Sequence, residues 1–177
     1  MSFLPLLSPG CSLQPLPQNA RALLCCGVAL AMACDFRYGT PSLKFGVPIA
    51  RTLGNSLSIT NVSRLIDMVG IARTKEVLMM AKLLNADEAQ QAGLVNGVFE
   101  AEVIADEVTS IAAEFAFRAP LTLQASKALV GRVVAQRRAA ADAGDDWVIT
   151  CYMSDDFKAA VNKFINKTSP HIIDSQG

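Results

Sequence analysis

The amino-acid sequence predicts an α/β fold whose second half is entirely helical. Short apolar runs separated by turn residues lie between positions 25 and 54, which is typical of small strands and buried helices. From about residue 100 onward, apolar side chains recur instead at helical spacing. With 177 residues, of which 51% are apolar, the sequence can also bury a core of its own.

Residues 1–21 differ in composition from everything that follows. Residues 1–20 contain no charged side chain and hold four of the eight prolines, Pro5, Pro9, Pro15 and Pro17. Proline lacks a backbone donor and blocks helix formation, and no strand-like alternation is present. We therefore expect residues 1–21 to be either disordered or foreign to the domain, and the sequence leaves both possibilities open.

Residues 22–99 are predicted to form the α/β core. A run of small apolar side chains over residues 25–33 predicts a buried helix. Residues 35–46 predict two short extended pieces around a Gly-Thr-Pro turn. A loop is then expected between Pro48 and Gly54.

Further helices are expected to complete this core. Helical spacing predicts one helix over residues 58–68 and another over residues 73–82, separated by Gly70. A short helix follows Asn85, which is a favourable N-cap, and Glu88 three residues later completes a capping box.

A strand and a helical region are expected to end the chain. Gly93 is placed to end the short helix, and residues 94–99 alternate enough to predict a strand. Residues 100–177 are assigned to a C-terminal helical region. Its predicted helices cover about residues 100–117, 120–138, 139–151 and 154–166.

The composition excludes several classes of function. Sixteen basic and sixteen acidic residues cancel and form no basic run, so we expect no nucleic-acid partner. The single histidine, His171, excludes a multi-histidine metal site, and no metal is expected. The longest apolar run, residues 22–34, is too short to span a bilayer, so no membrane partner is expected. Five cysteines without a CxxC pattern indicate reduced thiols and a cytoplasmic location.

Three segments resemble the enoyl-CoA hydratase/isomerase (crotonase) family. They are VALAMACDFR (28–37), LKFGVP (43–48) and residues 64–99, which include ADEAQQAGLVN (86–96). The resemblance covers about residues 22–167 and corresponds to the central and C-terminal part of the family; its N-terminal part has no counterpart here. It implies a partial crotonase-like ββα spiral core followed by a C-terminal helical trimerisation region, in a homotrimer or hexamer.

The resemblance also implies an activity on acyl-CoA thioesters. The family includes lyases and isomerases, and the expected function is that of an enoyl-CoA hydratase, which adds water to 2-enoyl-CoA in fatty acid metabolism. Two backbone N–H groups of the family stabilise the thioester enolate, where negative charge develops. One donor falls at Cys26, beside Gly27, whereas the family's upstream AGADLK-like motif for the other is absent. No cofactor is implied, because coenzyme A is carried by the substrate.

The same resemblance leaves open whether the chain is an enzyme. Hydratases of the family carry glutamates where this sequence has Ala29 and Ile49, and neither side chain can transfer a proton. Asn55 and Ser56 are the nearest polar candidates, either as site residues that bind or orient a ligand or as ordinary loop caps. The alternative is a truncated, catalytically silent member that keeps only acyl-CoA binding or oligomerisation.

The last predicted helix carries the candidate coenzyme A contacts. In the family, a lysine and an aromatic residue near the C-terminus reach the phosphates or the adenine. Lys163, Phe164 and Lys167 match this pattern, and a lysine suits a phosphate as a point charge. A solvated helix face is the other interpretation of these residues.

Overall fold

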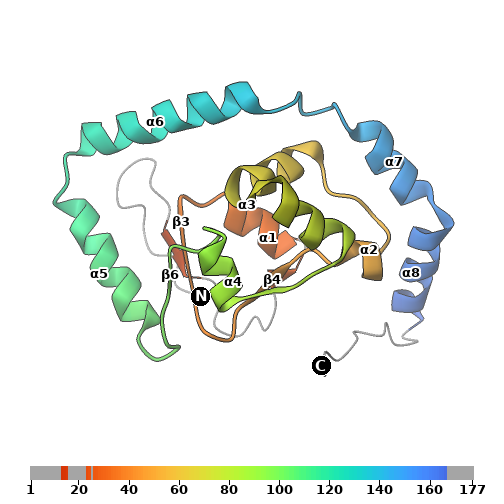
Figure 1. Ribbon diagram of the computed structural model, residues 1–177, viewed down its shortest axis with the longest axis horizontal. Helices are drawn as coiled ribbons and strands as arrows, with labels where there is room; N and C mark the ends of the chain where they lie inside the picture. Colours follow the sequence, from red (N-terminus) through yellow and green to blue (C-terminus); the bar gives the residue numbers. More distant parts are fainter. Residues whose placement is uncertain (1–12, 16–22, 25, 167–177) are drawn as a thin grey trace.

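The computed structural model describes residues 13–15, 23–24 and 26–166. Two small three-stranded sheets and the helices α1 to α4 form an α/β core, and the helices α5 to α8 run around its outside (Figure 1). The predicted order, α/β first and helical last, is therefore confirmed. No helix in the described part of the chain has the length and apolar character needed to cross a bilayer.

The first sheet has the strand order β1-β3-β6 and is parallel throughout. β1 (Leu13–Pro15) pairs with β3 (Phe36–Gly39), which pairs with β6 (Gly97–Val98). β1 corrects our expectation that the proline-rich segment contains no strand. Pro15 has no backbone N–H to donate to a neighbouring strand. It is tolerated because β1 is an edge strand, which has a neighbour on one side only. The rest of residues 1–21 lies outside the described residues.

The second sheet is mixed and lies under the core helices. β2 (Leu23–Leu24) runs parallel to β4 (Lys44–Gly46), and β4 runs antiparallel to β5 (Leu84–Asn85). The two predicted extended pieces within residues 35–46 are thus confirmed as β3 and β4, in different sheets. β2 and β5 have two residues each, which is too short to produce a readable alternation.

The core helices follow the local sequence signals closely. α1 (Cys26–Met32) occupies the predicted apolar run, and α3 (Ile59–Met79) is interrupted at Gly70, whose φ of 75° separates the two predicted helices. α2 (Ile49–Thr52) is a single short helix where we expected only a loop.

The predicted capping box of α4 (Ala86–Gln91) is present. Glu88 N–H donates to Asn85 Oδ1 at 2.9 Å, and Asn85 N–H donates to Glu88 Oε2 at 3.0 Å. Gly93 follows the helix with a φ of 72°, as expected of a C-terminal glycine. β6 covers only two residues of the strand predicted over 94–99.

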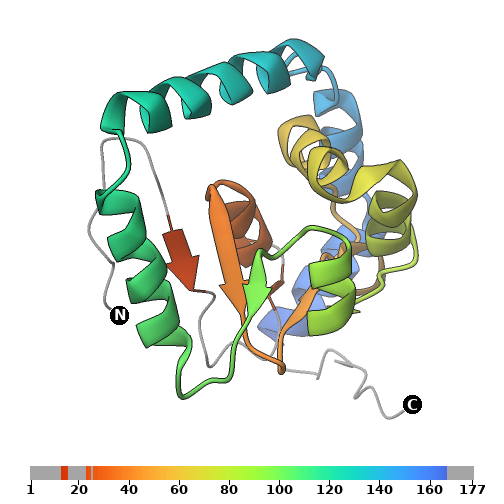
Figure 2. The same cartoon turned by 60° about the vertical axis from the view of Figure 1, so that its left-hand side comes forward.

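The outer helices also lie close to their predicted positions. α5 (Ile104–Ala116) packs beside β1 and β3 (Figure 2), and α6 (Pro120–Arg137) begins with Pro120 as predicted. α7 (Asp145–Met153) starts later than the predicted residue 139, because Gly144 weakens the helix and the acidic first turn follows it. α8 (Asp155–Ile165) is the last helix in the described part of the chain.

Buried side chains are concentrated in the core, and α5 is the last described helix that contributes any. The main cluster is drawn from α1, β4, α2, α3, β5, α4 and loop residues beside them. A second cluster joins Tyr38 on β3 to Ile104 and Val108 on α5. The helices α6, α7 and α8 bury no residue. Phe45, Leu65, Leu84 and Leu94 are completely buried in the main cluster.

Candidate functional site

The predicted oxyanion donor lies at the first residue of α1. The N–H groups in the first turn of a helix have no acceptor within that helix, and Cys26 and Gly27 occupy this turn. Val28, Ala31 and Met32 are buried and fix the helix to the core. The backbone at this end is therefore held in a defined direction, as a hydrogen-bond donor to a ligand must be.

The two positions expected to carry acids in a hydratase are apolar and differ in exposure. Ala29 is half-buried on α1, whereas Ile49 at the start of α2 is only 6% exposed and belongs to the main hydrophobic cluster. An ionised carboxylate in the place of Ile49 would have to be desolvated among apolar neighbours. Position 49 therefore has a packing role in this chain.

The loop after α2 brings Asn55 close to this position. Gly54 N–H and Leu53 N–H donate to the carbonyl oxygen of Ile49, at 2.8 and 3.0 Å. Asn55 follows directly, and its Nδ2 donates to the hydroxyl of Tyr152 on α7 at 3.2 Å. Asn55 Oδ1 is buried and has no hydrogen-bond partner.

Ser56, the other polar candidate in this loop, makes only a local contact. Its Oγ donates to the carbonyl oxygen of the adjacent Leu57 at 3.2 Å. The structure therefore brings Asn55 to a second element of the fold and leaves Ser56 in a loop-capping role. Sequence reasoning missed Tyr152, because no local pattern connects positions 97 residues apart.

The junction of α7 and α8 packs closely against the same loop. A Cβ on Gly54, which has a φ of +68°, would lie 3.3 Å from Asp156 Cβ and 3.5 Å from Phe157 N. The rings of Tyr152 and Phe157 are 4.7 Å apart, and Ser154 Oγ accepts from Phe157 N–H to cap α8. Glycine is thus favoured at position 54 by both its backbone conformation and the close approach of α8.

The proposed coenzyme A contacts lie at the end of α8. Lys163 and Phe164 are exposed there, and Phe164 retains 72% of its accessible surface. Lys167 lies outside the described residues, so its role as a coenzyme A contact stays a prediction.

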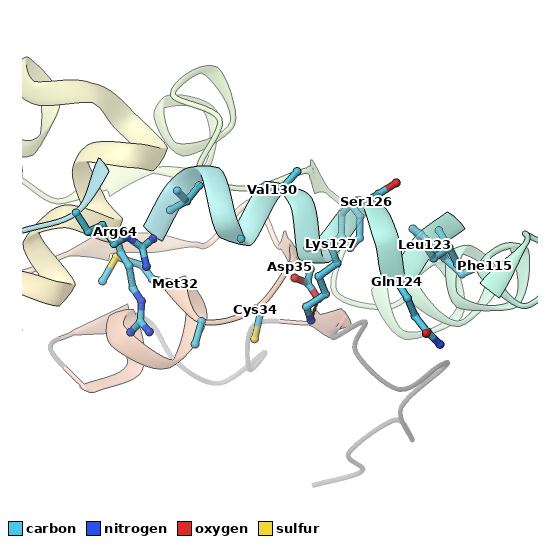
Figure 3. A pocket seen from close by; sticks show the side chains of 15 residues that line it. Met32, Cys34, Asp35, Arg64, Phe115, Leu123, Gln124, Ser126, Lys127 and Val130 are labelled. Carbon is cyan, nitrogen blue, oxygen red and sulfur yellow. Dashed lines mark hydrogen bonds and ion pairs between the residues drawn. The ribbon is translucent and has the colours of Figure 1, made fainter. Parts of the chain in front are cut away.

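A separate cavity of about 540 Å³ opens at the other end of α1 (Figure 3). Residues from α3, α6, the first part of β3 and the last turn of α5 line it. None of the predicted site residues within the described ranges lines it. Its wall at Met32 and the predicted donor at Cys26 lie at opposite ends of the seven-residue α1, about 9 Å apart along the helix axis. Its wall includes Met32, Asp35, Phe36, Arg64, Phe115 and Lys127.

Ion pairs hold α6 above this cavity. Lys127 Nζ lies 2.7 Å from Asp35 Oδ2, and Arg138 Nη2 lies 2.9 Å from Asp67 Oδ2. Both pairs are partly exposed, so each contributes only about 0–1 kcal/mol to stability. These two ion pairs join α6 and its C-cap to the core beside the cavity.

The shifted pKa values also belong to structural groups. Burial lowers the pKa of Arg37, whose Nε donates to the carbonyl oxygen of Leu94 at 2.7 Å. A hydrogen bond from Lys82 lowers the pKa of Glu88, which caps α4. Among the described residues, no group of three or more histidine, cysteine or acidic side chains is arranged to hold a metal ion.

Sequence comparison relates the chain to known proteins. The family model described as enoyl-CoA hydratase/isomerase matches residues 22–175. A short-chain-enoyl-CoA hydratase from Clostridioides difficile is 40% identical over 101 residues, which cover 57% of this chain and 64% of the relative. A crotonyl-CoA hydratase from Syntrophomonas wolfei is 34% identical over 149 residues, which cover 83% of this chain and 56% of the relative.

A solved structure supports the same conclusion. The enoyl-CoA hydratase/isomerase of Pseudoalteromonas atlantica T6c superimposes with a TM-score of 0.71 at 29% identity, over 85% of this chain and 60% of the other. The expected crotonase-type fold is therefore confirmed. The chain spans less than two thirds of the length of the two curated relatives. From the match over residues 22–175 and the shared fold, the chain belongs to the enoyl-CoA hydratase/isomerase family.

Proposed function

We propose that this protein acts on acyl-CoA thioesters, with the backbone N–H of Cys26 stabilising negative charge on the thioester oxygen. The observation that carries the proposal is the family match over residues 22–175, which includes the start of α1. A fixed donor directed at the oxygen where charge develops stabilises an enolate without a metal. The reaction is that of an enoyl-CoA hydratase or isomerase, and it needs no cofactor besides the coenzyme A of the substrate.

A second candidate function is acyl-CoA binding without turnover. Ala29 and the core residue Ile49 favour it, because neither can activate water. In this case the protein retains thioester affinity or a family-type assembly.

Coenzyme A recognition is proposed for the end of α8. Lys163 and Phe164 are exposed there, and Lys167 follows in the sequence. A lysine attracts the phosphates, and an aromatic ring can stack on adenine. Replacing Lys163 with glutamine is expected to weaken the binding of free coenzyme A more than that of the short thioester butyryl-pantetheine, which lacks the nucleotide.

The same proposal includes a homotrimer or hexamer in the cytoplasm. Leu129 and Val133 on α6 and Trp147 on α7 are largely exposed, which is unfavourable for an isolated chain in water. The odd cysteine count without a CxxC pattern supports a reducing compartment. Light scattering of the purified protein should give three or six times the monomer mass of 18.8 kDa.

Two measurements on the purified full chain test the function. Calorimetric titration with butyryl-CoA measures thioester binding, and the loss of crotonyl-CoA absorbance measures hydration. Binding together with hydration supports the hydratase, whereas binding without hydration excludes the hydratase and leaves an isomerase or the silent acyl-CoA-binding protein. If neither butyryl-CoA nor crotonyl-CoA binds, both acyl-CoA functions are wrong, and only the family-type assembly is left for light scattering to test.

A further inference from the structure

We propose that the cavity between α6 and the core binds an amphipathic monocarboxylate, such as the anion of a medium-chain fatty acid. The carboxylate pairs with Arg64, and the hydrocarbon tail lies along α6 toward Leu123 and Phe115. The inference does not depend on the proposed function, because the cavity and Cys26 lie at opposite ends of α1. The observation that carries it is the unequal charge of the two ends of the cavity.

The cavity has the size and the lining of a small-molecule site. Its volume of about 540 Å³ lies within the range of about 300–1,000 Å³ that is usual for such sites. Most of its lining residues are apolar, and a few charged and polar side chains are placed among them. This combination suits a ligand that is itself part apolar and part charged.

Arg64 supplies the cationic end of the cavity. Its Nη1 donates to the neutral Asn61 Oδ1 at 3.3 Å, and no ion pair in the described part of the chain includes it. Arg138 reaches the same turn of α3, because its partner Asp67 follows Arg64 by three residues. Figure 3 shows Arg64 beside Met32 at this end. A guanidinium that is not paired presents a planar fork of donors, which matches a carboxylate.

The charges of the cavity favour a ligand with a single negative charge. Three cations line the cavity, and two of them are paired, Lys127 with Asp35 and Arg138 with Asp67. The net charge that remains is +1, on Arg64. A carboxylate matches this charge, whereas a phosphate monoester near neutral pH carries about two negative charges.

The other end of the cavity is apolar. Figure 3 shows Phe115 and Leu123 there, at the far end from Arg64. Leu123, Val130 and Val134 recur at helical spacing on the face of α6 that lines the cavity. Val130 retains 63% of its accessible surface, so the described chain leaves this face largely uncovered. A hydrocarbon tail along this face removes apolar surface from water, which favours binding.

A ligand in this position joins α6 to the core. It contacts Arg64 on α3 and Val130 on α6, which lie on facing walls of the cavity. The ion pairs across the same gap are partly exposed and therefore weak. Binding should consequently reduce the local opening of α6, which hydrogen exchange measures.

The test compares octanoate with octanol, which has the same chain length and no charge, by calorimetric titration of the full chain. The wild type should bind octanoate about tenfold more tightly than octanol. Arg64→Gln should weaken octanoate binding about tenfold and leave octanol within about twofold, because it removes only the charged donor. Val130→Ser should weaken both ligands about threefold, because both tails lose an apolar contact.

Arg73→Gln is the matched control, since Arg73 also lies on α3 but pairs with Glu76 at 2.9 Å and does not line the cavity. It should leave both affinities unchanged. Octanoate should also slow hydrogen exchange in α6 and not in α4. The proposal is overturned if the wild type does not bind octanoate, if it binds octanol equally well, or if Arg64→Gln retains the preference for octanoate.

Two further outcomes would assign the cavity or the ligand differently. Octanoate affinity should be the same with and without saturating butyryl-CoA, and competition would place octanoate in the acyl-CoA site and overturn the proposal. Light scattering should give the same mass with and without octanoate. A loss of mass would show that the cavity is a contact between copies of this chain, which would also overturn the proposal.

Discussion

In the α/β core, Phe45, Leu65 and Leu84 are completely buried, whereas the helices α6, α7 and α8 together bury no residue. The core is held by apolar contact, which stabilises by roughly 25 cal/mol per Å² of surface removed from water. The described contacts from the outer helices to the core include the ion pairs of α6 and the hydrogen bond of Tyr152 on α7. The difference shows that apolar burial specifies the core, while α6, α7 and α8 are joined to it by weak polar contacts and leave apolar surface exposed.

The largest effect is expected from removing a core aromatic ring. Phe45→Ala should lower the free energy of unfolding by about 3–5 kcal/mol, because it leaves a cavity in the main cluster. The matched control is Phe117→Ala, since Phe117 is 91% exposed and should change stability by less than about 0.5 kcal/mol. Urea denaturation measures both, and equal losses would contradict the division into core and outer helices.

Loss of the α4 cap should have a smaller effect within the core. Asn85→Ala removes the acceptor for Glu88 N–H and should lower the free energy of unfolding by about 1 kcal/mol. Gln90→Ala, at an exposed position of the same helix, serves as the control. A stability equal to that of the control would show that the capping box contributes nothing measurable.

The pH dependence of this cap follows from the lowered pKa of Glu88. Hydrogen bonds from Lys82 and from Asn85 favour the ionised form in the folded state. Its contribution is therefore present above the ordinary carboxyl pKa of about 4.3 and is lost as the pH falls through the lower folded-state value. Stability curves of the wild type and Glu88→Gln should differ at pH 7 and converge in acid. A difference that grows on acidification would reverse the expected sign.

The smallest effect is expected for the ion pairs that position α6. Lys127→Met should lower global stability by less than about 1 kcal/mol and more at low salt than at high salt. Hydrogen exchange should accelerate in α6 and not in α3, because only the outer helix depends on this contact. Unchanged exchange in α6 would mean that the pair does not hold the helix in place.

Local structure was largely predictable from the sequence. The α4 cap, the interruption at Gly70 and the proline that begins α6 depend on residues a few positions apart, and all three were predicted. The start of α7 was placed too early, because the alanine run favours helix, whereas Gly144 and the acidic first turn after it set the observed start. The strands β2 and β5 were missed, because two-residue pairings carry no periodic signal.

The candidate site was predictable only in part. The position of Cys26 at a helix start and the apolar side chains at positions 29 and 49 follow from the sequence and its family resemblance. The burial of Ile49 in the core and the hydrogen bond to Tyr152 do not. Both depend on the path of the chain between distant segments.

The sequence by itself therefore determined the order of elements, their caps and breaks, and the family of the chain, because these depend on neighbouring residues and on motifs. Only the tertiary structure decided that Leu13–Pro15 pairs with β3, that α6 lies above a cavity and that Asn55 meets Tyr152. These contacts join residues up to 97 positions apart. Their formation depends on the packing of the whole core, which no local pattern encodes.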